Sequence, residues 1–291
     1  TESKDERESV IEDSIFTQNY DSDRDIYRRN YEIYGGLVYD ANSQNSFSMN
    51  AKIGQWEFDR TIKSELNTSS QTDSTCLFTD AENFLIQNKY ISSDLGYRHD
   101  FEQEGHQLDL SFVIAQTEVN ELGIPLENTQ QYYDIQSTAD RNNYQFKADY
   151  SLPIGEKWIL ESGFQNEIKS SQTDYLYQSR TDENSPWETP LDYSGEMNFQ
   201  RMVNALYASM STEVNGLQLK AGLRLEMSHR NLEQKTLQKQ YNDQNTHLFP
   251  SLHLSKSLKK DQQISLSYSQ RINRPNEWML HPSPYSTGRN M

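Results

Sequence analysis

The sequence predicts an all-β protein, with about ten strands of an antiparallel transmembrane β-barrel. Three observations predict it. Apolar and polar residues alternate in most of about ten segments, as they do in strands with two different faces. Short turns and long polar stretches alternate between these segments, and aromatic residues stand beside several short turns. The segments also exceed the roughly 5–6 residues of ordinary strands and suit the roughly 9–11 residues that cross a bilayer at a tilt.

The first five expected strands cover 29–40, 46–59, 84–101, 106–119 and 142–153. Four of them carry a row of apolar residues at alternate positions: Tyr31, Ile33, Leu37 and Tyr39; Phe47, Met49, Ala51 and Ile53; Leu108, Leu110, Phe112 and Ile114; Tyr144, Phe146, Ala148, Tyr150 and Leu152. The third segment is predicted from its composition, without an assignment of its faces.

The other five expected strands cover 157–171, 197–212, 217–230, 247–257 and 262–274. Apolar rows again mark four of them: Trp158, Leu160, Phe164 and Ile168; Leu217, Leu219, Ala221, Leu223 and Leu225; Leu248, Leu252 and Leu254; Ile264, Leu266 and Tyr268. The segment 197–212 is predicted from composition. No helix would sort Leu217 to Leu225 onto one face and Lys220, Arg224 and Glu226 onto the other.

The connections carry the membrane prediction. Short turns are expected at Asp40–Ser46, Glu102–Gly105, Pro153–Glu156, Glu213–Gly216 and Lys256–Asp261, and Asn215-Gly216 is a hairpin signal. Long loops are expected at 60–83, 120–141, 172–196 and 231–246. Several structureless loops beyond about 12–15 residues are unusual in a compact soluble domain. Outer-membrane barrels, in contrast, combine short periplasmic turns with long outer loops.

Composition excludes several classes of protein. The net charge of −16 argues against nucleic acid as a partner, because an acidic chain repels phosphates. No apolar run approaches the roughly 20 residues of a membrane-spanning helix. Aromatic residues make up 11% of the chain, which argues against acidic disorder despite a mean hydropathy of −0.93. One cysteine, Cys76, cannot form an internal disulfide.

Charged residues opposite the apolar rows are predicted to face a water-filled lumen. A basic side chain facing lipid costs about 2–4 kcal/mol at the bilayer midplane. Such residues would guide a ligand or bind a plug, and the sequence does not choose between these roles. The candidates are Lys52, Lys147, Asp149, Glu161, Glu167, Lys220, Arg224 and Glu226, with Asp109 beside them.

The stretch 172–196 is the candidate ligand-contacting loop. It interleaves acidic residues with Tyr175, Tyr177, Trp187 and Tyr193, and aromatic rings give large contact area to sugars or peptides at low entropic cost. A loop that faces lipopolysaccharide, or that contacts a lid protein, is the alternative interpretation.

No enzyme is predicted. The sequence lacks HExxH, GxSxG, Walker A and GxGxxG patterns, so no catalytic residue, cofactor or metal site is expected. His229 and His247, at the mouths of neighbouring strands, are the only candidates for a protease site at the rim of a small closed barrel.

The last third of the chain resembles a known family. The runs Leu248-Phe-Pro-Ser-Leu-His-Leu-Ser255 and Ile264-Ser-Leu-Ser-Tyr-Ser-Gln-Arg-Ile-Asn-Arg-Pro275 are similar to those of Bacteroidetes outer-membrane proteins of the TonB-dependent receptor type. Ala205-Leu-Tyr-Ala-Ser209 and Ala221-Gly-Leu-Arg-Leu-Glu226 resemble the strand pair before them. Gln270 stands where an Arg is common in that family.

The resemblance implies a barrel of about 22 strands, closed around an N-terminal plug, that imports a glycan, peptide or metal chelate with energy passed from the TonB complex. Residues 1–291 are then an internal piece of one outer-membrane barrel domain, whose plug and other strands lie elsewhere. Outer-membrane lipid, a surface lid lipoprotein and an unknown ligand are the implied partners. A structural or adhesive surface barrel without transport is the alternative.

Overall fold

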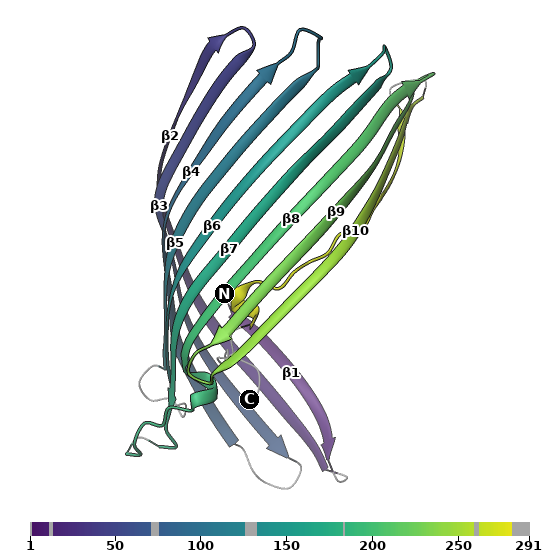
Figure 1. Ribbon diagram of the computed structural model, residues 1–291. Helices are drawn as coiled ribbons and strands as arrows, with labels where there is room; N and C mark the ends of the chain where they lie inside the picture. The colour runs from purple at the N-terminus through teal and green to yellow at the C-terminus, as the bar shows by residue number, and fades with distance from the viewer. Residues whose placement is uncertain are drawn as a thin grey trace.

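The computed structural model describes residues 2–11, 14–70, 76–125, 133–182, 184–258 and 262–280. They form one antiparallel sheet of eleven strands in chain order, which curves into a wall (Figure 1). The strands are β1 (Glu2–Ile11), β2 (Ser14–Asn42), β3 (Asn45–Ser70), β4 (Cys76–Asp100), β5 (Gln107–Pro125), β6 (Tyr133–Ile154), β7 (Trp158–Ser179), β8 (Gly195–Val214), β9 (Leu217–Gln234), β10 (Lys239–Ser257) and β11 (Gln263–Ser269). Two 3-10 turns, η1 (Leu191–Tyr193) and η2 (Glu277–Leu280), complete it.

The predicted all-β antiparallel architecture is confirmed, and the ten expected strands correspond to β2–β11. The strand β1 was not predicted. It pairs with β2 from Glu2↔Asp23 to Ile11↔Ser14. Its sequence, ESKDERESVI, is polar at nearly every position and therefore has no apolar row. Within the described ranges, no helix is both long and apolar enough to cross a bilayer.

Three of the four predicted long loops, 60–83, 120–141 and 231–246, are wrong for most of their described length, because the strands continue through them. Residues 71–75 and 126–132 lie outside the described residues. Of the fourth, 172–196, residues 180–194 do form a connection. β3 extends to Ser70, and the expected loop 231–246 shrinks to a turn at 235–238 between β9 and β10. Backbone groups in these stretches pair across strands as they do elsewhere. A strand that meets water on both faces needs no apolar residues, so a hydropathy pattern does not detect it.

Apolar side chains form a belt on the convex face of the sheet, on the half nearer the short turns. The belt residues are well exposed, as Ile33 at 77%, Leu206 at 54% and Leu223 at 48% illustrate. On each strand the belt ends where polar residues replace apolar ones at the same alternate positions, as from Ile53 to Gln55 on β3. A stripe of this kind is what a barrel turns toward lipid.

The belt shifts along the strands, which reveals their tilt. On β2 it runs from Tyr31 to Tyr39, centred on Gly35, and the register links Gly35 across seven strand steps to His229 on β9. On β9 it runs from Leu217 to Met227, centred on Gly222, which is seven residues from His229 (229 minus 222). The belt therefore shifts by one residue, about 3.3 Å, for each step of about 4.8 Å to the next strand. This shift gives a strand tilt of about 35°, within the range of outer-membrane barrels.

The hairpin between β8 and β9 closes as its sequence predicts. Asn215 and Gly216 both adopt positive φ, 52° and 72°, as a type I′ turn requires. A Cβ at Gly216 would meet no atom within 4 Å, so the glycine is needed for backbone conformation and not for space.

We expect Gly216→Ala to destabilise the protein by about 1 kcal/mol, because a left-handed conformation costs a residue with a Cβ roughly that much. Gly35→Ala is the matched control, since its Cβ would also meet nothing within 4 Å and its φ is not positive. Urea unfolding of the full natural protein in lipid vesicles measures both. Equal midpoints for the two variants would contradict the turn assignment.

We also expect Ala148→Lys, at the centre of the belt on β6, to destabilise the protein in vesicles by about 2–4 kcal/mol. Ala115→Lys is the same substitution on the opposite face, where Ala115 pairs with Ser92 and Asn143. It should cost little. If both variants unfold at the same urea concentration, the convex face does not meet lipid.

Candidate functional site

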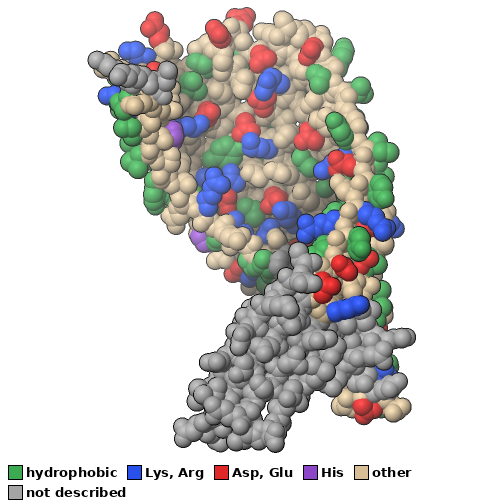
Figure 2. Space-filling model, turned by 180° about the vertical axis from the view of Figure 1, so that it is seen from behind, with side chains coloured by type: hydrophobic (Ala, Val, Ile, Leu, Met, Phe, Trp, Pro, Cys, Tyr) green, Lys and Arg blue, Asp and Glu red, His purple; other side chains and the backbone are tan. Residues whose placement is uncertain are grey.

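The concave face of the sheet is hollow and carries many charged side chains (Figure 2). The register places all eight charged candidates on the face opposite the belt. For example, one row across neighbouring strands reads Arg98, Asp109, Asp149, Gly163, Tyr207 and Arg224. The alternation in the sequence therefore sorted these residues onto one face. Their role in lining a water-filled lumen stays a prediction.

Tyr207 connects three strands at the centre of this row. Its hydroxyl donates to Asp149 Oδ1 at 2.5 Å across Gly163 of the intervening strand β7. A Cβ at Gly163 would lie 2.5 Å from the Tyr207 ring, so glycine makes this crossing possible. Lys147 Nζ also pairs with Asp149, at 2.5 Å, and the Arg224 guanidinium lies 5.2 Å from the Tyr207 ring centre.

Two carboxylates on this face have more than one partner: Glu161 joins β7 to β8 and β9, and Glu226 of β9 joins that strand to residues beyond β11. Glu161 accepts hydrogen bonds from Ser209 Oγ at 2.9 Å and from Lys220 Nζ. Glu226 is 8% exposed and pairs with Arg224 Nε and Arg274 Nη2, each at 2.7 Å. Arg224 also donates to Gln165 Oε1 at 3.0 Å. Each of the two carboxylates therefore has two donors, so the face holds groups of paired charges and not isolated ones.

Residues 270–280, which we call the inner strap, lie over the concave face. The strap, yellow in Figure 1, leaves the end of β11 and runs back toward the middle of the sheet. Four contacts hold it. They are the Arg274–Glu226 pair, a 2.8 Å ion pair between Arg141 and Glu277, a 3.3 Å hydrogen bond from Arg201 Nη1 to the Pro275 carbonyl, and packing of Leu280.

The predicted strand 262–274 is too long. In the structure β11 ends at Ser269, and residues 270–274 belong to the strap. Pro275 lacks an N–H and restricts Arg274 before it, so continued pairing with a further strand is disfavoured there. Leu280 packs against an apolar cluster of Tyr175, Met197, Phe199 and Leu232. Sequence reasoning missed the strap because its partners are far away along the chain. The only sequence signal of the strap was the segment RINRP, residues 271–275, with two arginines and a proline.

The candidate ligand-contacting aromatics divide between a strand and a loop. Tyr175 and Tyr177 lie on β7 and not in a loop, and Tyr175 is only 6% exposed within the apolar cluster. Trp187 and Tyr193 lie in the connection 180–194, where the Arg180 guanidinium stands 4.7 Å from the Trp187 ring and Tyr193 packs edge-on against Tyr177. Burial makes Tyr175 unsuited to stack on a ligand in this conformation. Ligand contact by the other three stays a prediction.

The tip of the same connection is fixed by Asp182. Its carboxylate accepts hydrogen bonds from Ser185 Oγ at 2.7 Å and from the Asn184 backbone N–H at 2.9 Å. These hydrogen bonds hold the pKa of Asp182 below its usual range. The tip is therefore a structured turn that presents a carboxylate to solvent.

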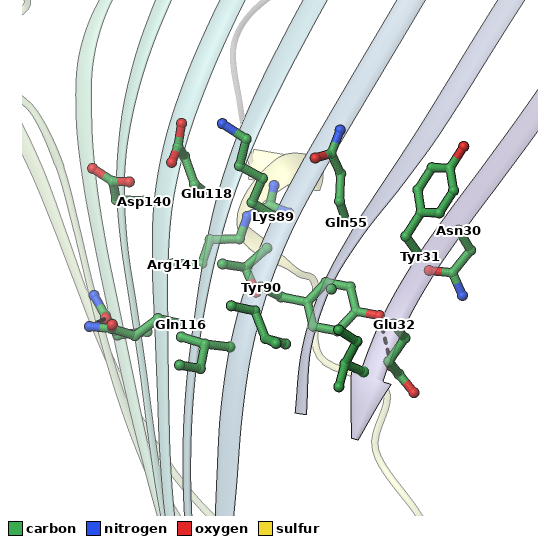
Figure 3. Close-up of a pocket in the computed structure, with 16 residues that line it drawn as sticks. Asn30, Tyr31, Glu32, Gln55, Lys89, Tyr90, Gln116, Glu118, Asp140 and Arg141 are labelled. Atoms are coloured by element: carbon green, nitrogen blue, oxygen red, sulfur yellow. Dashed lines mark hydrogen bonds between the residues drawn. The ribbon is translucent and has the colours of Figure 1, made fainter. Parts of the chain in front are cut away.

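A groove of about 1240 Å³ follows the upper edge of the belt over β2–β6 (Figure 3). Residues paired on neighbouring strands form a row across it, and each ends in a polar group. They are Tyr31, Gln55, Lys89, Glu118 and Asp140. The next row toward the short turns begins with Ile33, Ile53 and Ile91. Tyr90 and Glu32 also line the groove, and the Tyr90 hydroxyl donates to Glu32 Oε2 at 2.7 Å. The groove therefore marks the line at which the apolar belt gives way to polar surface.

The two rim histidines do not form a site. His229 lies on the convex face of β9. His247 lies on the concave face of β10, opposite Glu226 in the strand register. In the part of the chain that the structure describes, no group of three or more His, Cys, Asp or Glu residues could hold a metal.

Comparison with known proteins matches the chain to a protein family. A family model described as outer membrane protein beta-barrel family matches residues 99–291. A search of the curated proteins found no match. Solved structures to which the chain is similar include the ferric citrate transporter FecA in the unliganded form (10% identity, TM-score 0.46, covering 89% of this chain and 42% of that one). Another is the ferric yersiniabactin uptake receptor FyuA from Yersinia pestis (9%, 0.47, 91% and 46%).

A third is the alcaligin outer membrane receptor FauA from Bordetella pertussis (11%, 0.43, 92% and 42%). The chain spans less than half the length of these three structures. A likeness at this level carries no argument about function.

We expect Glu226→Gln to loosen the inner strap, because Arg274 and Arg224 lose their shared carboxylate. A cysteine at position 273 (N273C) in a Cys76→Ser background, labelled with a water-soluble thiol reagent, should react about tenfold faster when Glu226 is replaced, which corresponds to about 1.4 kcal/mol. Glu167→Gln is the control, since Glu167 pairs with Lys169 and not with the strap. Unchanged labelling in the Glu226 variant would show that the pair does not hold the strap.

Proposed function

The chain belongs to the outer membrane protein β-barrel family, and from this premise we propose that it forms part of the wall of an outer-membrane importer of the TonB-dependent receptor type. The observation that carries the proposal is the contrast between the two faces. The convex face is an apolar belt, and the concave face carries groups of ion pairs and hydrogen bonds. A wall of this kind separates lipid from a polar passage.

The polar face favours a passage over a filled interior. Several of its charged side chains remain partly exposed, with Lys220 and Glu161 at 48% and 45%. Ion pairs in a fully packed interior would suffer a desolvation penalty that their attraction seldom repays. Ion pairs that stay in contact with water avoid that penalty, as they would in a lumen through which a solute moves.

Closure of the wall is part of the proposal. The described strands run from β1 to β11 in one open sheet, with no pairing between β1 and β11. Unpaired strand edges are costly in a bilayer, which offers no hydrogen-bond partners. We therefore propose that further strands complete a barrel of about 22 around a plug, as the resemblance of the RINRP segment implies.

The partners follow from the same resemblance. The plug would connect the barrel to the TonB complex, and a glycan, peptide or metal chelate would be the imported ligand. The strands continue well beyond the belt, with β7 reaching Ser179, and the connection 180–194 carries the exposed side chains of Trp187 and Tyr193. This end of the wall is where we place contact with the ligand or with a lid lipoprotein.

Growth of two mutant strains tests the proposal, one lacking this protein and one lacking TonB. Each strain is grown with ferric siderophores, cobalamin, oligosaccharides or oligopeptides as the limiting nutrient. We expect both strains to lose growth on the same class of nutrient, and the natural gene to restore it in the first strain. Normal growth of the first strain on every class, together with reduced attachment to surfaces, would instead support a structural or adhesive barrel.

A further inference from the structure

A small cavity lies between the concave face of β8–β10 and the inner strap. Its volume is about 120 Å³, and strands and strap line it together. Its polar lining comes from both parts, and consists of Arg201, Ser228, Arg230, Asp243, Asn245 and His247 of the sheet and Asn273 and Arg274 of the strap. A second cavity, of about 340 Å³, is lined by Arg224 and Gln165 among others. Arg201 lines both cavities, together with residues 272–274 of the strap.

Arg201 is a buried cation. It is 8% exposed, and no carboxylate of the described residues lies within ion-pair distance of it. Its Nη1 donates to the Pro275 carbonyl at a long 3.3 Å, and its Nε has no hydrogen-bond partner among the described residues. Burial of an uncompensated guanidinium is costly, so such groups are normally paired with an anion.

The nearby carboxylates are already engaged with other cations. Glu167 pairs with Lys169 at 2.7 Å, Asp243 pairs with Arg230 at 3.3 Å, and Glu226 is shared between two arginines. In the register, Lys169, Arg201 and Arg230 also stand side by side on three neighbouring strands. The immediate surroundings of the cavity therefore have an excess of positive charge in a chain whose net charge is −16.

His247 supplies a second buried polar atom in the same cavity. Its Nδ1 makes no hydrogen bond to any residue that the structure describes. The Ser228 side chain, 9% exposed, lines the cavity beside it. A ligand there would meet a guanidinium, an imidazole and a hydroxyl, all of which can donate to oxygen. The carboxylate in the lining, that of Asp243, is paired with Arg230.

We propose that this cavity binds an oxyanion, the carboxylate or phosphate group of a small solute, with Arg201 as its main ligand. Guanidinium groups recognise such anions through charge-assisted, often bidentate hydrogen bonds. A volume of 120 Å³ exceeds the roughly 30 Å³ share of one water molecule several-fold, and is large enough for a single anionic group. Water alone would satisfy Nε and Nδ1 but would leave the charge of Arg201 uncompensated.

This inference does not depend on the proposed import function, because it concerns equilibrium binding by the purified protein. The full natural protein in detergent is titrated with inorganic phosphate and, separately, with malonate, by calorimetry and by thermal unfolding. Sodium chloride at equal ionic strength is the reference. Binding of phosphate alone would identify a phosphorylated solute, and binding of malonate alone would identify a carboxylate.

The variant Arg201→Gln should bind the active anion at least tenfold more weakly and should lose the anion-dependent rise in unfolding temperature. Arg201→Lys keeps the positive charge but loses the planar guanidinium that can donate two parallel hydrogen bonds, and we expect intermediate binding. Arg141→Gln is the matched control, since it removes another contact of the strap outside the cavity and should leave binding intact. Retention of the heat-dependent mobility shift of folded barrels on gels shows that each variant is folded.

Two results would overturn the proposal. A folded Arg201→Gln protein that binds phosphate or malonate as the natural protein does would show that the anion binds elsewhere. A natural protein that responds to both anions no more than to chloride would show that the cavity holds water only.

Discussion

The constraint on which the rest of the structure depends is that a bilayer offers no hydrogen-bond partners, so every backbone group in the wall must pair with a neighbouring strand. Pairing in β2–β10 is continuous and in register, apart from a shift near Asp40. Continuous pairing fixes the alternation of side chains, and that alternation gives each strand one face for lipid and one for the interior. The stagger of the belt by one residue per strand then sets the tilt at about 35°.

The same pairing explains why a chain with a mean hydropathy of −0.93 contains a membrane wall. Only alternate residues meet lipid, and only over part of each strand. Beyond the belt the strands continue with polar residues on the convex side, as Gln55, Glu57 and Asp59 do on β3. The polar extension raises the rim of the wall above the bilayer and ends in the turns and connections where an external partner would first make contact.

Alternation was enough to predict eight of the ten expected strands and the face of each charged candidate, because both follow from a period of two. Composition predicted the other two strands, without their faces. It did not predict β1 or the polar extensions, since a strand wetted on both faces has no apolar row. It also did not predict contacts between distant residues. Gly163 lets Tyr207 reach Asp149 across β7, and Arg274 meets Glu226 only because the strap folds back over the sheet. These features depend on three-dimensional packing, which no local pattern encodes.

The central claim is that the two faces meet different solvents, and thiol labelling in the native membrane tests it most directly. Ala208 and Ser209 are adjacent on β8 and face the belt and the interior, respectively. In a Cys76→Ser background, Ser209→Cys should react with a charged, water-soluble thiol reagent at least about tenfold faster than Ala208→Cys. Equal labelling of the two cysteines would contradict the account, because it would mean that both faces of the sheet are in water.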